Sequence, residues 1–305
     1  MGYLSSVADA LLNGMGTNLF AKSANLISGI APLFAAGFGV YLLLVMMSYY
    51  NRGLDENIMD FSKRMVGWFV IIACAFNAGM YNKLANLMYE MPEAIGSMFG
   101  SGEYSMSALD TNFENLERTI VQTCEHASSL PITEIGERIG IYLLALFIFV
   151  FGSIYFAATT AFYLVAKLSL AMVILIGPVF LGAMLFPATR QWGMNWIGQI
   201  LSYTISIVFY VILGSLQQDF FSNHINTVLS GEISSLIMLI PIACIFGTST
   251  LIFLVVAWNI PSIASGLTGG ASMGGMPRAL ISVARYMKSV SLGGKGGGGG
   301  SISRK

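Results

Sequence analysis

The residues with the most distinctive chemistry lie between two long apolar runs, in the stretch GPVFLGAMLFPATRQWGMNWIGQ at 177–199. Arg190 can bind a phosphate or a carboxylate through its planar guanidinium, yet this stretch contains no acidic residue. Trp192 and Trp196 are four residues apart and would share one face of a helix. Both residue types favour the membrane–water interface, where a lipid phosphate can pair the arginine. We therefore expect this stretch either to anchor a membrane helix or to fix a packed turn.

Residues that could bind a metal or carry catalysis are sparse. Among the three cysteines, Cys124 forms a Cys-x-His pair with His126, but no second pair exists to complete a metal site. No carboxylate lies between Glu137 and Asp219, and neither histidine falls in an apolar run. Ion-coupled transporters generally need ionisable groups inside the membrane. We therefore expect no enzyme activity, no metal and no cofactor.

The composition is that of a polytopic membrane protein. Of 305 residues, 55% are hydrophobic and only 10% are charged, whereas a soluble domain carries about a quarter charged residues. Long apolar runs without alternation favour helices, and such a run needs about 17–25 residues to span a bilayer. The expected fold class is all-α. The candidate segments are 23–51, 65–82, 139–166, 168–189, 191–218 and 233–260.

The charges are segregated along the chain, although the formal net charge is zero. Residues 90–138 hold nine acids and two bases, and residues 278–305 hold six bases and no acid. Basic residues mark cytoplasmic segments. The loop at 51–64 and the basic tail are therefore expected inside, and the acidic segment outside.

This orientation requires an odd number of crossings after the acidic segment, but four apolar runs follow it. We therefore expect about five full crossings plus a half-embedded or re-entrant helix. The best candidate for the incomplete crossing is 168–189, because Pro178 removes a helix hydrogen bond beside Gly177. Lys167 and Arg190 would then mark boundaries between runs. The alternative is that all six segments cross.

The pattern predicts four regions. Residues 1–89 form an N-terminus on the outer side with two transmembrane helices, and 90–138 an acidic loop on the outer side, helical around 108–127. Residues 139–264 form a transmembrane helical cluster. Residues 265–305 form a glycine-rich hinge, a basic amphipathic helix and a disordered cytoplasmic tail. In that helix Arg278, Arg285 and Lys288 share one face, which suits an anionic phospholipid surface.

Small residues recur at four-residue spacing in two of the apolar runs. Such rows let helix backbones approach closely in lipid. They fit either ordinary packing within the chain or an interface between subunits, and the pattern leaves both open. The two rows are Ala31, Ala35 and Gly39, and Ser153, Ala157 and Ala161.

The run GPVFLGAMLFPATRQWGMNWIGQILSYTISIVFYVIL at 177–213 resembles the signature region of a known family. That family is the TrbL-type polytopic inner-membrane subunit of bacterial type IV secretion systems, the sixth VirB component. In it, a helix with Gly-Pro leads to a turn of the Phe-x-x-Thr-Arg type and then to a helix that contains tryptophan. The matching positions here are Gly177, Pro178, Phe186, Thr189, Arg190, Trp192 and Trp196.

The resemblance implies a non-enzymatic assembly and channel subunit in the bacterial inner membrane, active in pilus biogenesis and in conjugative transfer of DNA or protein. It implies a homo-oligomeric ring, with a pentamer as one copy number. The implied partners are a minor pilin-like stalk protein, the bitopic inner-membrane subunit, the secretion ATPase, pilin and the transferred cargo. The alternative function is a small-molecule or ion permease, which would show flux when reconstituted alone.

Overall fold

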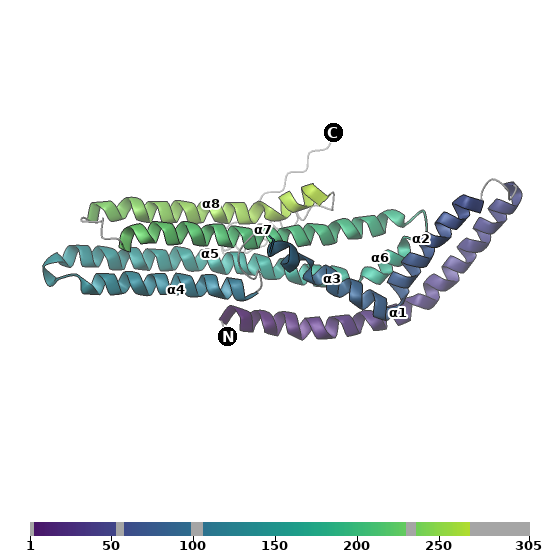
Figure 1. Ribbon diagram of the computed structural model, residues 1–305, viewed down its shortest axis with the longest axis horizontal. Coiled ribbons are helices and arrows are strands. Elements are labelled where there is room, and N and C mark those ends of the chain that lie inside the picture. Colours follow the sequence, from purple (N-terminus) through teal and green to yellow (C-terminus); the bar gives the residue numbers. More distant parts are fainter. Residues whose placement is uncertain (1–2, 53–57, 99–105, 230–235, 269–305) are drawn as a thin grey trace, which may run out of the picture.

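The computed structural model describes residues 3–52, 58–98, 106–229 and 236–268 (Figure 1). Within these ranges every regular element is helical, which confirms the all-α fold class. The elements are α1 (Tyr3–Arg52), α2 (Ile58–Phe76), α3 (Ala78–Gly96), α4 (Met106–Ser129), the single turn η1 (Ile132–Glu134), α5 (Ile135–Leu175), α6 (Gly177–Ala183), α7 (Arg190–Leu229) and α8 (Leu236–Thr268).

Four of the described helices are long and apolar enough to cross a membrane, or five if one bent pair counts as a span. This agrees with about five crossings. The four segments are Lys22–Ser48, Ile135–Leu175, Arg190–Gln217 and Ala243–Thr268. At 41 residues, α5 is about 60 Å long, twice the roughly 30 Å of bilayer hydrocarbon. The bundle therefore extends beyond the hydrocarbon layer unless it tilts strongly.

The predicted boundary at Lys167 is wrong. Residues 139–166 and 168–175 form one continuous helix, α5, because the charge of Lys167 is paired inside the protein and needs no interfacial position. The predicted break at Gly177 and Pro178 is present: α5 ends at Leu175, and α6 begins with the proline in its first turn. Thus 168–189 is not a separate membrane segment.

The bent pair is α2 with α3, which meet at Asn77 at an angle of 83° between Phe61–Phe76 and Ala78–Gly96. Asn77 has extended backbone, and its side-chain oxygen accepts a hydrogen bond from the Met80 amide at 3.1 Å, which caps α3. Such a pair is a broken span or a re-entrant loop. The sequence analysis placed the incomplete crossing in 168–189. In the structure, the bent pair that could be such a crossing lies around residue 77.

The acidic segment is more helical than the sequence suggested. Helix α4 covers the region predicted around 108–127, while residues 90–96 continue α3 instead of forming a loop. Helix α4 packs along α5, where Leu116 lies against Gly152. The basic residues Arg278, Arg285 and Lys288 lie outside the described residues.

Helices α5, α7 and α8 pack together as the centre of the fold. Helix α8 lies on one side of the α5–α7 pair, and α4 lies on the other side (Figure 1). The second half of α1, together with the whole of α2, forms an arm that projects past the end of this bundle (Figure 1). Short α6 lies where the arm meets the bundle. A Cβ atom on Gly182 of α6 would lie 2.8 Å from Phe76 and 2.9 Å from Phe34, so α1 and α2 approach its backbone closely.

Gly193 is expected to be intolerant of substitution. A Cβ atom there would overlap Met184 and lie 2.9 Å from the Phe180 carbonyl oxygen. Gly193→Ala should therefore lower the midpoint of thermal unfolding in detergent, measured by tryptophan fluorescence. Gly39→Ala is the matched control, because no atom lies within 4 Å of its Cβ position. This variant should leave the stability unchanged or raise it by up to about 1 kcal/mol, because alanine favours helix more than glycine does. Equal midpoints for both variants would contradict this packing.

Candidate functional site

The end of α5 is capped by two side chains from other helices. Pro178 has no N–H, so it cannot donate to the carbonyl of Ile174 four residues earlier. The hydroxyl of Tyr81 on α3 donates a hydrogen bond to that carbonyl instead. One residue earlier, the carbonyl of Val173 accepts from the indole N–H of Trp196 on α7 at 2.8 Å. The helix break thus creates acceptors that hold α3 and α7 against α5.

Gly177 leaves the space that these two rings occupy. A Cβ atom at this position would overlap the Tyr81 hydroxyl and lie 2.5 Å from Cζ2 of Trp196. Trp196 is only 4% exposed and Tyr81 is fully buried. The Gly-Pro pair therefore does two separate things: proline frees a carbonyl, and glycine admits the side chains that cap it.

The remaining residues of the predicted turn connect α6 to α7 and to the arm. The Thr189 hydroxyl donates to the Ala183 carbonyl at 2.7 Å, which closes the end of α6. The Phe186 ring lies 5.8 Å from the ring of Tyr41 and 6.4 Å from that of Phe38, both on α1. Phe186 thereby contacts the arm while Thr189 sets the start of α7.

Arg190 and Trp192 point away from the packed turn. Arg190 is exposed as the first residue of α7, and none of the described carboxylates pairs with it. Trp192 is 58% exposed, whereas Trp196 is buried, so the two tryptophans do not share one environment despite their spacing. The structure brings together Gly177, Pro178 and Trp196 but leaves the other two available to lipid or another chain.

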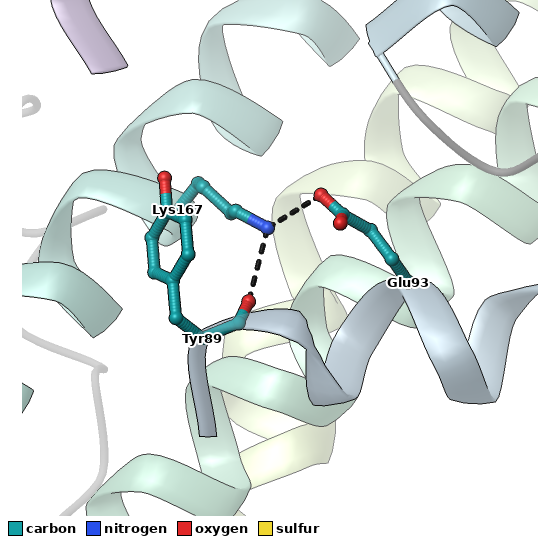
Figure 2. A network of polar contacts seen from close by, with 3 residues as sticks. All are labelled: Tyr89, Glu93 and Lys167. Carbon is teal, nitrogen blue, oxygen red and sulfur yellow. Dashed lines mark hydrogen bonds and ion pairs between the residues drawn. The ribbon is translucent and has the colours of Figure 1, made fainter. Parts of the chain in front are cut away.

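A partly buried ion pair joins α3 to α5 about two turns from the capped end (Figure 2). The Lys167 ammonium lies 2.6 Å from Oε1 of Glu93 and donates a hydrogen bond to the Tyr89 carbonyl at 3.1 Å. It also lies 4.3 Å from the centroid of the Tyr89 ring, in a cation–π contact. The Lys167 side chain is 2% exposed and that of Glu93 is 40% exposed, so the pair opens outward on its acidic side.

Sequence reasoning missed the partners in both clusters. Tyr81 was not singled out, and Glu93 was assigned to an exported acidic loop. One signal was available: a buried lysine is rarely tolerated without a carboxylate or carbonyl partner. The position of Lys167 in a long apolar run therefore predicts a carboxylate partner from another part of the chain. The spacing of residues along the chain does not identify which carboxylate it is.

The small-residue rows lie largely at the surface of the chain. Ala35, Ala157 and Ala161 are exposed, while Ala31, Gly39 and Ser153 are half-buried. A Cβ atom on Gly39 would meet no atom within 4 Å. These positions are free to contact lipid or another subunit.

The arrangement is suited to positioning helices. Within the described ranges, no three His, Cys, Asp or Glu side chains come together as a metal site could require. Lys167 is occupied by three contacts on α3, and Tyr81 and Trp196 by backbone carbonyls. These contacts join α3, α5 and α7 at one end of the bundle.

Fold and site together define a polytopic helical membrane protein whose bundle is joined at a helix break. The chain belongs to the TrbL/VirB6 plasmid conjugal transfer protein family, whose model matches residues 38–260 and so includes the whole site. It is a membrane component of the type IV secretion class.

Two curated relatives carry the name type IV secretion system protein VirB6. The protein from Bartonella quintana (strain Toulouse) is 23% identical over 268 residues, covering 87% of this chain and 79% of its own length. That from Bartonella henselae is 24% identical over 269 residues, covering 88% of this chain and 76% of its own length.

Removing one partner of the ion pair should destabilise the protein far more than removing both partners. Glu93→Leu leaves Lys167 buried without its carboxylate, which should destabilise the protein by about 1.5–3 kcal/mol. Adding Lys167→Met should recover most of that loss. Glu90→Leu, on the exposed face of the same helix, is the matched control and should have little effect. Thermal unfolding in detergent is measured for the parent protein and these three variants; a double variant as unstable as Glu93→Leu would refute the pairing.

The two tryptophans should respond differently to the same replacement. Trp196→Phe removes the donor to the Val173 carbonyl and should cost about 2 kcal/mol. Trp192→Phe changes an exposed ring and should shift stability by less than about 0.5 kcal/mol. Urea or thermal unfolding of both variants checks this difference. Equal losses would mean that the indole hydrogen bond does not hold the turn.

Proposed function

We propose that this chain is an inner-membrane assembly and channel subunit of a bacterial type IV secretion system, supporting pilus biogenesis and transfer of DNA or protein. The observation that carries this proposal is the capped break between α5 and α7, which lies inside the region matched by the family and uses Gly177, Pro178 and Trp196. A structural joint, rather than a reactive centre, suits a subunit that assembles with others. Family membership also favours this function over a permease.

The subunit is proposed to form a homo-oligomeric ring, with a pentamer as one copy number. Two observations support an oligomer. None of the most apolar window of α1 is buried within the chain, although the other three spans have 33–50% of theirs buried. Ala35, Ala157 and Ala161 also present small side chains on the surface, where a neighbouring helix could approach closely.

The proposed partners are those of the secretion machine. They are a minor pilin-like stalk protein and pilin on the periplasmic side, the bitopic inner-membrane subunit, and the secretion ATPase on the cytoplasmic side. Exposed Arg190 is proposed to bind a lipid phosphate or a neighbouring subunit. Arg278, Arg285 and Lys288 are proposed to hold the tail on anionic phospholipid, as their sequence pattern suggests.

Arg190→Ala offers the cleaner functional test, because the side chain is exposed and its loss should leave the fold intact. We expect normal membrane levels, loss of cross-linked oligomer and loss of transfer. Trp196→Ala should show the same functional loss, with lower stability in addition, and Trp192→Ala a milder one. Membrane level, chemical cross-linking and transfer frequency are measured on the same cells. Normal transfer by the Arg190 and Trp196 variants at normal abundance would reduce the stretch to an interfacial anchor.

A further inference from the structure

One side of the bundle carries a row of polar side chains at the level of the ion pair, beside α1, which packs against α3, α4 and α5. Contacts of Tyr81 with Ile174 and of Glu93 with Lys167 place α3 along the last part of α5. The outer face of α3 exposes Lys83, Asn86 and Glu90. A hollow of about 540 Å³ opens on this face, lined by these three residues with Leu87, Met91 and Ala94.

The polar side continues on α4. This helix runs back along α5 from Gly152, where Leu116 packs, toward the start of α5 at Ile135. Helices α3 and α4 both pack against α5 and α7. The exposed face of α4 carries Glu114, Glu117, Gln122 and Glu125, with Arg118 and Val121 exposed among them. We define the polar track as six exposed residues of the two helices: Asn86, Glu90, Glu114, Glu117, Gln122 and Glu125.

The opposite side of the bundle is apolar at the same levels. Ring contacts of Tyr155 with Phe253 and of Phe162 with Trp258 set α5 and α8 parallel and in register. Ile252, 63% exposed, is therefore level with Gly152 and Leu116, while Ile263, 48% exposed, is level with Lys167. Between them Val255 is 60% exposed.

No single environment suits both sides. Exposed carboxylates are strongly disfavoured in hydrocarbon, and a row of half-exposed isoleucine and valine is disfavoured in water. The two sides lie at equal depth, so moving the chain along the membrane normal cannot relieve the conflict. One side must face lipid and the other must face water.

We propose that the polar track of α3 and α4 forms one wall of a water-filled passage between copies of this chain, with α8 turned to lipid. This inference rests on the oligomer proposed above. Exposed Glu90, Glu114, Glu117 and Glu125 outnumber exposed Lys83 and Arg118, so the wall is acidic. Such a wall attracts cations and basic segments of polypeptide and repels a bare phosphodiester backbone.

Cysteine accessibility tests the passage in the assembled protein. Cys74, Cys124 and Cys244 are first replaced by serine, and single cysteines are then introduced at Asn86 and Gln122. Matched controls at nearly the same levels are Ile263→Cys for Asn86 and Ile245→Cys, where the isoleucine is 39% exposed, for Gln122. In intact membranes, treated from either side with a charged, impermeant thiol reagent, the track positions should react at least about tenfold faster than their controls. Rates as slow as the controls, with fast reaction after detergent, would overturn the proposal.

The sign of the wall is tested at Gln122→Cys with two small thiol reagents that differ in charge. A cationic reagent should react faster than an anionic one, and high salt should reduce the difference. Equal rates at low salt would refute the acidic wall.

Cross-linking of copies in the same membranes separates this inference from the proposed function. Reactive track positions without cross-linked copies would refute the ring and with it a passage between copies, while leaving a water-exposed face. Cross-linked copies with unreactive track positions would refute the passage and leave the ring.

Discussion

The structure depends on the two carbonyls that are left without helix donors where α5 stops. A break inside a membrane protein is costly unless something satisfies the freed backbone. Here Tyr81 and Trp196 satisfy it, and Gly177 gives them room. Because the two donors come from α3 and α7, meeting this local requirement also fixes three helices relative to one another. The turn that follows can then direct α7 back along α5.

The ion pair of Lys167 with Glu93 completes the attachment of α3. Tyr81 near the start of α3 and Glu93 near its end each contact α5, so the helix is held at two points. This explains how α3 can leave α2 at 83° without losing its place. A buried ion pair adds little net stability compared with apolar packing, but it strongly penalises any arrangement that separates the charges. Its contribution is therefore to specify where α3 docks.

Much of the fold could be predicted from the apolar runs, since the all-helical class, α7 and the helix in the acidic segment follow from length and composition. The break at Pro178 was predicted because proline acts locally. Long-range pairings were not: the charge of Lys167 looked like a boundary until Glu93, 74 residues away, was seen beside it. Trp192 and Trp196 have the same type and helical spacing, so only the packing of α6 against α7 could tell the buried ring from the exposed one.

The joint and the sidedness of the bundle bear on each other. Glu93 contacts Lys167 from the polar side, and its carboxylate remains 40% exposed there. The charge on α5 is therefore satisfied from the side on which α3 and α4 present carboxylates, while α8 keeps an apolar surface. If α3 separated from α5, the bundle would lose part of its polar side, and Lys167 would lose its carboxylate partner in the same step. Docking of α3 and the division of the bundle into polar and apolar sides thus depend on the same contact, which ties the fold of a single chain to the surface it offers in an assembly.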